Sequence, residues 1–361
     1  MTDPAATTGT PSQVLQALRI VGQLSAAVIA ALLCGAVLIA VAGADPVVGY
    51  LALFNGAFGS LNSVVEVLVK AIPLLLAGLG LALAFRAGFW NIGAEGQIFM
   101  GALAAVWVGL NAHGWPAYVA LPAVILAGFV GGALWGVIPG ILRAKLGASE
   151  IITTIMFNYI AFYVVNYFVT GPLVEADQFL AQTDPIAKSA ELPRILRPTR
   201  LHAGIFVAVA AAGVLYWLML RSTVGFRARV VGANEEAARY AGMSVGWTWV
   251  VVSGVSGGLA GLAGMVEVAG VHQLLLEDIS GGLGFTAIVV ALLGWLHPVG
   301  VVIAAILFAA LDVGADSMQR VIGVPVTLVY IIQALVVLFV LARSALEHGT
   351  FERFLRRFRS A

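Results

Sequence analysis

The chain has 361 residues, of which 61% are hydrophobic and only 10% charged, and its formal net charge at pH 7 is +1. Soluble globular proteins contain roughly 45–50% apolar and about 25% charged residues, so this composition excludes an ordinary soluble domain and predicts a polytopic membrane protein. The net charge is uninformative about nucleic acid, but no basic tract suited to binding it is present, so we expect no nucleic-acid partner.

Residues that usually hold metals or redox groups are sparse. The only cysteine is Cys34, inside an apolar run, which excludes an intrachain disulfide, a cysteine-based zinc site and a cysteine-ligated iron–sulfur cluster. The five histidines are scattered with no pair at ligand spacing, so we expect neither a metal nor another cofactor. No G-x-x-x-x-G-K-[ST] motif is present, so ATP, if it supplies the energy, must bind to another polypeptide.

The chain begins with a polar stretch, residues 1–19, which predicts a cytoplasmic N-terminal tail. An apolar run from Ile20 to Gly43 follows, and Ala42-Gly43-Ala44 resembles a signal-peptide cleavage site. The apolar part of a signal peptide is only about 7–15 residues long, so the longer run favours an uncleaved first span.

Nine more apolar runs follow, so the sequence predicts an all-α polytopic membrane protein with about ten spans in residues 20–343. These runs cover Val64 to Phe85, Ile98 to Leu110, Tyr118 to Leu142, Ile151 to Thr170, Ala203 to Leu220, Thr248 to Gly270, Leu283 to Leu296, Val299 to Val313 and Val324 to Leu341. Polar connections at residues 171–202 and 222–247 interrupt them, and a basic tail covers residues 344–361.

Basic residues set the expected orientation. With ten spans and both termini in the cytoplasm, thirteen Lys and Arg residues fall in inside segments and five in outside segments. This asymmetry follows the positive-inside rule, so we expect residues 171–202 to form an external loop and residues 222–247 a cytoplasmic one.

Ten spans divide into two halves of five, and an odd number per half inverts the second half in the membrane. The third and eighth runs correspond to each other, are both short for a bilayer core of about 30 Å, and both follow glycine-rich breaks. Short, glycine-interrupted segments at matching positions of inverted halves are typical of a substrate pathway, so we predict broken short helices beside it.

A group of polar residues precedes the third run. Trp90, Asn91, Glu95 and Gln97 bring an aromatic ring, two amides and a carboxylate together within eight residues. They can line the pathway and bind a ring-bearing solute, or satisfy backbone groups at a helix end, and the two roles are compatible. Asn158, deep in the fifth run, is a further pathway candidate.

Glu267 lies inside the seventh run, where an ionisable residue is a functional hypothesis by default. If it faces the protein interior it needs a hydrogen-bond donor, and His272 can supply one from the same end. The alternative is a proton-binding acid of a secondary transporter, but no second acid or histidine stands at relay spacing in the sequence.

The stretch Ser222 to Trp247 is too highly charged to lie in hydrocarbon without heavy cost. Asn234 can cap a short helix over Glu235 to Ala241, which Gly242 then stops. The pattern predicts a short amphipathic helix that faces the aqueous phase, and an ordinary solvated loop is the alternative.

Two motifs resemble those of a known family. Glu236-Ala237-Ala238, three residues and Gly242 form an E-A-A-x-x-x-G arrangement that resembles the coupling loop of ABC importer permeases. The run G-F-W-N-I-G-A-E-G-Q, Gly88 to Gln97, resembles permeases of the branched-chain amino acid, ribose and nucleoside importers, especially the longer nucleoside (simple sugar) subunit. The resemblance covers about Leu24 to Arg343, although Met243-Ser244-Val245-Gly246 replaces the I-x-L-P tail of the broader coupling motif.

This resemblance implies the permease subunit of an ATP-driven importer in the bacterial inner membrane, without enzymatic activity of its own, that moves nucleosides by alternating access. It implies three protein partners: a cytoplasmic ATPase, a second related permease that completes a heterodimer, and an extracytoplasmic solute-binding protein. The residues it implies for ATPase coupling are Asn234, Glu235, Glu236, Arg239 and Gly242. The alternatives are the same fold importing a sugar or branched-chain amino acid, and an ion-coupled secondary transporter.

Overall fold

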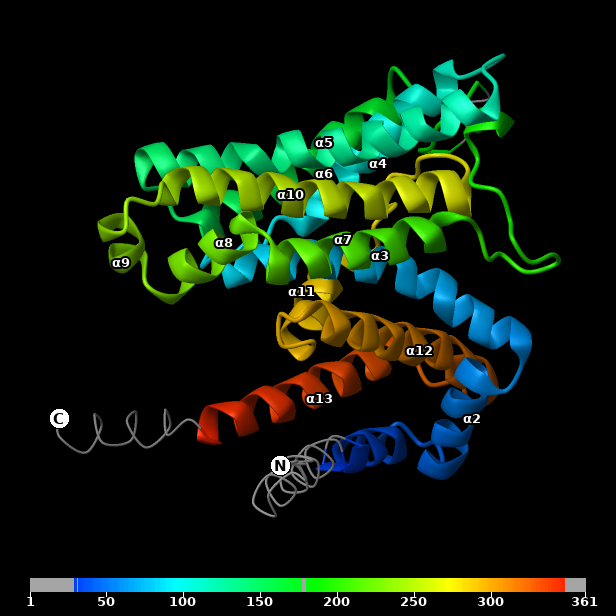
Figure 1. The fold of residues 1–361 in the computed structure, drawn as a ribbon. Helices are drawn as coiled ribbons and strands as arrows, with labels where there is room; N and C mark the ends of the chain where they lie inside the picture. Colours follow the sequence, from blue (N-terminus) through cyan, green and yellow to red (C-terminus); the bar gives the residue numbers. More distant parts are fainter. Residues whose placement is uncertain (1–28, 31, 177–179, 348–361) are drawn as a thin grey trace, which may run out of the picture. The chain divides into compact units, whose positions relative to one another are not determined.

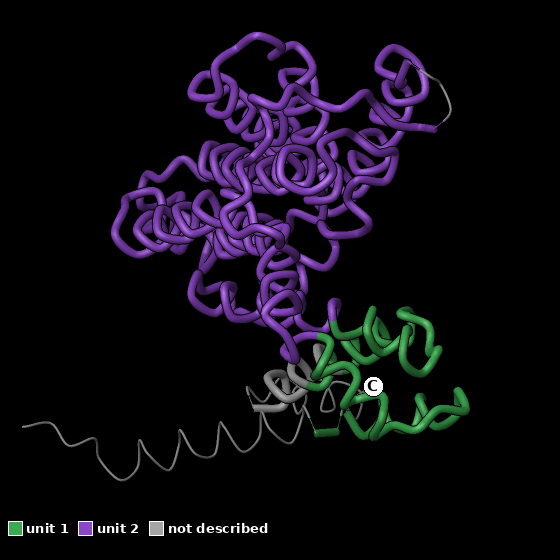
Figure 2. Tube along the Cα trace, turned by 90° about the vertical axis from the view of Figure 1, so that its right-hand side faces the viewer, with its two compact units in different colours: residues 1–56, 314–361 green, residues 57–313 purple. Residues whose placement is uncertain are grey.

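The structure is a computed structural model that describes residues 29–30, 32–176 and 180–347. This part of the chain is helical, and its extended pairing is limited to two isolated bridges, Gln182 with Leu276 and Arg194 with His202. It divides into two compact units, one of residues 57–313 and one of residues 1–56 and 314–361 (Figure 2). The fold class predicted from the apolar composition is therefore confirmed as all-α.

The larger unit holds the helices that correspond to the second through eighth apolar runs (Figure 1). They are α3 (Leu61–Arg86), α4 (Ala94–Asn111), α5 (Ala117–Leu146), α6 (Glu150–Thr170), α7 (Gly204–Arg221), α8 (Thr223–Ala233), α9 (Glu235–Tyr240), α10 (Val245–Val266), the π-helix η2 (Glu267–His272) and α11 (Leu283–Leu293). The 3₁₀ turn η1 (Lys188–Ala190) and the first part of α12 (Pro298–Ile322) also belong to this unit.

Helices α3 and α10 are the buried centre of the larger unit, and α10 packs along α5, α4 and α3. Small residues make this close packing possible. A Cβ atom at Gly132 of α5 would overlap the backbone oxygen of Gly257, and one at Gly261 would overlap that of Gly128. The two helices therefore approach so closely that only glycine fits at these positions.

Six described helices are long and apolar enough to cross a membrane, or seven if a bent pair is one span. Those six are α3, α5, α6, α7, α10 with η2, and α12, whereas α11 has only 11 residues, as expected for a broken segment. The chain is thus a multi-pass helical membrane protein; the ten spans and the inverted halves stay a prediction.

The first span differs from the expected straight run over Ile20 to Gly43, of which residues 20–28 lie outside the described residues. A helix over Leu32–Val41 is followed by a 116° bend into α2 (Pro46–Phe58), which the sequence reading missed. Gly43 takes a left-handed φ of 82°, and the Asp45 carboxylate accepts a hydrogen bond of 2.8 Å from the Val47 N–H. Together a glycine stop and an acidic cap end the first helix and start α2, which lies between the first and second predicted runs.

The smaller unit contains this bent pair, the end of α12 and α13 (Val326–Glu347). Its core is an apolar cluster of Ile39, Ala315, Met318, Val324, Val329 and Ile332. Helix α12 extends nine residues beyond the predicted end of the ninth run at Val313, so Asp316 as well as Asp312 lies within a helix.

The two polar connections lie at opposite ends of the larger unit, with α8 and α9 at one end and residues 171–203 at the other (Figure 1). Backbone hydrogen bonds hold the 171–203 connection to the segment after η2. Examples are the bonds from the Ile186 N–H to the Gln273 oxygen (2.8 Å) and from the Thr183 N–H to the Leu275 oxygen (3.0 Å). These bonds fix residues 183–186 of the connection against residues 273–275.

Candidate functional site

A charged cavity of about 340 Å³ lies beneath the 171–203 connection. Helix α3, the connection, η2, the segment before α11 and α12 all contribute to its wall. We define this charged cavity by its ionisable lining residues: Glu66, Lys70, Arg200, Glu267, His272, Asp278 and Asp312. In a protein with so few charges, this concentration within a membrane-spanning unit marks a candidate functional site.

Two ion pairs join separate elements across the charged cavity. Lys70 Nζ of α3 lies 2.8 Å from Asp312 Oδ2 of α12. Arg200 of the connection pairs with Glu66 of α3. Each cation thus has a carboxylate partner, which lowers the cost of holding charge inside an apolar protein.

Glu267 is the buried carboxylate of the cavity wall. Its side chain is only 11% exposed, and its Oε2 lies 3.4 Å from Nε2 of His272, at the other end of the π-helix. The predicted contact between Glu267 and His272 is confirmed. The wider turn of a π-helix is often found at functional sites.

The segment leading into α11 supplies the remaining polar groups of the cavity. Asp278 Oδ1 accepts a hydrogen bond of 3.3 Å from the Gly281 N–H. The Ser280 hydroxyl lies beside the Glu95 carboxylate but makes no hydrogen bond of normal geometry within the described residues, although Ser280 is only 2% exposed. The Ser280 oxygen is buried, so Ser280 lines the cavity without offering its hydroxyl to it.

Glu95 links the two short segments that the sequence singled out. From the first turn of α4, its carboxylate accepts hydrogen bonds from the backbone N–H groups of Gly284 (2.7 Å) and Gly282 (3.1 Å), at the start of α11. A carboxylate is favourable at a helix N-terminus because the free N–H groups and the helix dipole both attract it.

The other predicted polar residues form a buried network behind Glu95. Asn91 and Gln97 bond each other through their amides at 2.9 and 3.2 Å, and Asn91 also bonds Ser256 of α10 at 3.0 Å. Asn158 of α6 accepts from the Gly96 N–H (2.8 Å) and donates to a backbone oxygen. These contacts match the helix-end role weighed for the cluster.

Most of the predicted pathway residues do not line the charged cavity. Among the described residues that line it, only Glu267 belongs to the predicted pathway set; Asn91, Gln97 and Asn158 lie elsewhere, buried against protein. Trp90 is 46% exposed, and its ring centroid lies 5.0 Å from that of Phe85.

Helix α9 has the local structure that its sequence predicts. The Asn234 side chain accepts a 2.9 Å hydrogen bond from the Ala237 N–H, Arg239 and Glu235 form an ion pair of 2.6 Å, and Gly242 follows with a φ of 73°. Ala238 is buried against its own loop, while Glu236 and Arg239 are exposed. The predicted short, capped helix is confirmed.

Close contacts connect α8 and α10 to the loop before α4. Gly232 lies against the backbone of Arg86, and the Trp249 indole donates to the Ala87 oxygen at 3.3 Å. The Arg143 guanidinium stacks 4.0 Å over the Trp249 ring and pairs with Glu150 of α6. Helix α8 therefore contacts the end of α3 directly, and α10 connects the loop before α4 with α5 and, through Arg143, with α6.

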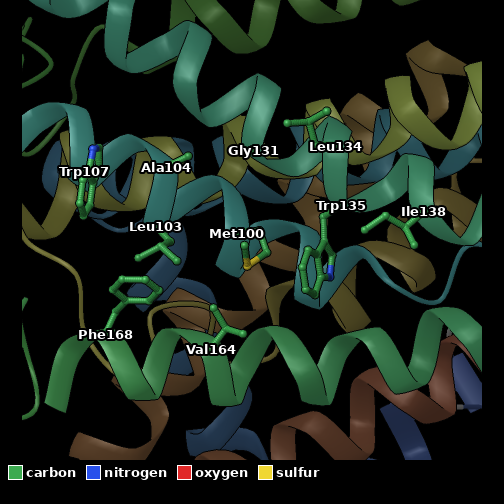
Figure 3. Close-up of a pocket in the computed structure, with 10 residues that line it drawn as sticks. All are labelled: Met100, Leu103, Ala104, Trp107, Gly131, Leu134, Trp135, Ile138, Val164 and Phe168. Atoms are coloured by element: carbon green, nitrogen blue, oxygen red, sulfur yellow. The ribbon is translucent and has the colours of Figure 1, made fainter. Parts of the chain in front are cut away.

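A second cavity, of about 400 Å³, is open at the surface and is lined by α4, α5 and α6. Figure 3 shows that apolar side chains such as Met100, Leu103, Leu134 and Phe168 surround it, with the rings of Trp107 and Trp135 at its sides. A solute rich in hydroxyl groups would lose its hydrogen bonds to water there without replacement. This cavity therefore does not suit a polar solute.

His202 lies near the end of the 171–203 connection, two residues before α7. It is fully buried, and its Nδ1 accepts a hydrogen bond of 3.2 Å from the Gly204 N–H. Burial, with the nearby charges of Arg194 and Arg200, lowers the pKa of His202 to about 4. The ring is therefore neutral at pH 7.

Sequence reasoning missed most of the charged cavity. Lys70 stands out as a charge within an apolar run, but its partner Asp312 is 242 residues away, and Glu66 and Arg200 are 134 residues apart. No local pattern signals pairs this distant.

Known proteins give an independent view of the chain. Residues 63–341 match the family model described as branched-chain amino acid transport system / permease component. The chain is 42% identical to the guanosine ABC transporter permease protein NupP of Bacillus subtilis (strain 168), over 89% of this chain and 93% of NupP.

Two further relatives have comparable coverage. The glucose ABC transporter permease protein TsgB13 of Haloferax volcanii is 41% identical over 87% of this chain and 85% of its own. The nucleoside ABC transporter permease protein NupB of Lactococcus lactis subsp. cremoris is 34% identical over 89% and 90%. No solved structure matches the chain. The chain therefore belongs to the family of branched-chain amino acid transport system permease components.

Proposed function

We propose that this chain is the permease subunit of an ATP-driven importer that moves nucleosides across the bacterial inner membrane by alternating access. The observation that carries the proposal is the arrangement of the larger unit, with the charged cavity at one end and the exposed, capped α9 at the other. Solute enters from the cavity end, and a partner ATPase acts on α9. The chain itself performs no chemistry.

Nucleosides are favoured by two relatives, the guanosine permease and the nucleoside permease, whereas the glucose permease supports a sugar. The cavity chemistry fits both classes, because ribose and glucose hydroxyls and the N–H groups of a base can all donate to carboxylates such as Glu267. A sugar or branched-chain amino acid therefore remains the alternative solute for the same permease.

In this proposal one predicted pathway residue contacts the solute and the others support the surrounding backbone. Glu267 contacts solute in the charged cavity, and Glu95 holds the start of α11 beside it. Asn91, Gln97 and Asn158 fix the backbone behind Glu95, and Trp90 presents an exposed ring on the far side of this network. The two short segments line the pathway within ten spans arranged as two inverted halves, with both termini in the cytoplasm.

Helix α9 and its flanks form the surface for the ATPase. Asn234 and Gly242 fix the two ends of the helix, Glu235 and Arg239 stiffen it through their ion pair, and Glu236 is exposed for contact. A second, related permease completes a heterodimer, and an extracytoplasmic solute-binding protein delivers the solute to the opposite end.

One observation favours ion-coupled transport as a second candidate. The sequence shows no acid at relay spacing from Glu267, but the fold brings Glu66, Asp278 and Asp312 into the same cavity. ATP-driven import remains the better-supported function because it explains the capped helix α9 and agrees with the relatives. An ionophore that abolishes uptake while cellular ATP is maintained would favour ion coupling.

The double variant Glu236→Ala with Arg239→Ala tests the coupling role in vesicles that contain the complete transporter. Loss of an exposed docking contact of this kind is expected to lower solute-stimulated ATP hydrolysis and uptake at least about tenfold, with insertion into the membrane unchanged. The control Glu191→Ala with Arg194→Ala removes the same charge types from the opposite end. Equal activity of the first double variant and the unmodified protein would remove α9 from this role.

A further inference from the structure

We propose that the charged cavity is a charge filter, which admits neutral or cationic solutes and excludes phosphorylated ones. The inference rests on the proposed function in one respect, namely that solute passes through this cavity. It concerns the class of solute and does not distinguish a nucleoside from a sugar.

The wall of the charged cavity carries more acidic than basic side chains. Four carboxylates, those of Glu66, Glu267, Asp278 and Asp312, face two permanent cations, Lys70 and Arg200. The one remaining ionisable lining residue, His272, contacts Glu267. Carboxylates therefore outnumber cations whichever charge state His272 takes.

Both permanent cations are already paired with acids, so the excess negative charge lies on the other two carboxylates. Lys70 lies 2.8 Å from Asp312, and Arg200 pairs with Glu66, so both permanent cations are already compensated by acids. Glu267 and Asp278 remain as carboxylates without a permanent cation as partner. A phosphate, with a charge of about −1.5 to −2 at pH 7, would have to displace an existing pair and approach these acids.

Confinement strengthens the repulsion. Charges inside a cleft with low-dielectric walls interact more strongly than charges in water, and such clefts focus the field of one sign. A like-charged solute is thereby kept out before it makes contact. A neutral solute meets no such barrier.

The same wall offers good partners to neutral polar solutes. Ionised carboxylates are pure acceptors, which suits hydroxyl and N–H donors of a solute. Glu267, Asp278 and the two paired acids therefore offer a neutral solute acceptors from several sides of the cavity.

Charged thiol reagents measure this potential directly. Cys34, the only native cysteine, is first replaced by Ser, and Val271→Cys then places a reporter in the cavity wall on η2. The probes are a trimethylammonium methanethiosulfonate, which is cationic, and a sulfonatoethyl methanethiosulfonate, which is anionic. The ratio of their reaction rates is compared with that at His113→Cys, an exposed position on the α4–α5 turn.

We expect the cation-to-anion rate ratio at residue 271 to exceed that at residue 113 by at least about tenfold. Adding Glu267→Gln and Asp278→Asn should bring the ratio down toward the control. A second reporter, Leu283→Cys on another part of the wall, should show the same preference and covers the case in which Val271→Cys misfolds.

A ratio at 271 and 283 equal to or below that of the control would overturn the filter. So would thiols at both positions that react with neither reagent, since the cavity would then be closed to solutes. Because the measurement uses no nucleoside, its failure leaves the proposed substrate untouched, and failure of nucleoside uptake leaves the filter untouched.

Discussion

At the scale of single residues, acids and bases around the charged cavity pair with one another, some across long stretches of the chain. Glu267 finds His272 five positions further along, a contact that the sequence predicts because both residues lie at one end of one helix. Lys70 finds Asp312 only through the packing of α3 against α12. The sequence therefore indicates Glu267 and its nearby partner His272, but not the ion pairs between distant residues.

Glu95 should stabilise the fold through the start of α11. Removing its carboxylate by Glu95→Ala leaves the N–H groups of Gly282 and Gly284 without their acceptor, at an expected cost of about 1–3 kcal/mol. Glu95→Gln keeps one acceptor oxygen and should lose less. Thermal unfolding of the purified protein in detergent checks the order, and an alanine variant as stable as the unmodified protein would contradict it.

His202 should make the protein sensitive to acid. Its pKa in the folded protein is about 4, below the ordinary 6.5, so the unfolded chain binds the proton more readily between these values. The free energy of unfolding therefore falls as the pH drops through this window and is unaffected above it. At about pH 5 the expected loss is about 2 kcal/mol.

The comparison that checks this uses unfolding temperatures at about pH 7.5 and about pH 5. The unmodified protein should lose more stability on acidification than His202→Gln, while the exposed control His113→Gln should behave like the unmodified protein. Equal acid sensitivity of the unmodified protein and His202→Gln would show that His202 is not responsible.

At the scale of elements, the helices predicted most accurately are those with a local signal at each end. Asn234 and Gly242 define α9 as the sequence indicates. Helix α2 was missed because it lies after the bend at Gly43 and Asp45, between the first and second predicted runs, and is only 13 residues long. The π-helix η2 was missed because its wider turn carries no recognised sequence pattern.

The contact between α5 and α10 should tolerate no side chain at its centre. Gly132→Ala places a methyl group against the backbone of Gly257, so we expect a loss of about 1–3 kcal/mol in stability. Gly213→Ala on α7, where nothing lies within 4 Å of the added carbon, is the matched control and should be neutral or stabilising by up to about 1 kcal/mol. Equal unfolding temperatures for the two variants would contradict this account of the interface.

At the scale of the whole molecule, composition predicts a multi-pass helical membrane protein, and the two motifs predict its permease family. The count of spans is harder to obtain, because α11 is short and α2 is separated from the helix before it by a sharp bend. Of the charged cavity, the sequence identified only Glu267 as a pathway candidate, since the walls come from five segments spread between residues 66 and 312.

The uptake of labelled guanosine tests the central claim most directly. It is measured in cells that lack this protein, with and without the gene restored, in the presence of excess unlabelled nucleosides, glucose, ribose or leucine. We predict that restoration recovers uptake and that guanosine and adenosine block it while glucose, ribose and leucine do not. Uptake that glucose, ribose or leucine abolishes, or that restoration fails to recover, would contradict the assignment of nucleosides as the solutes.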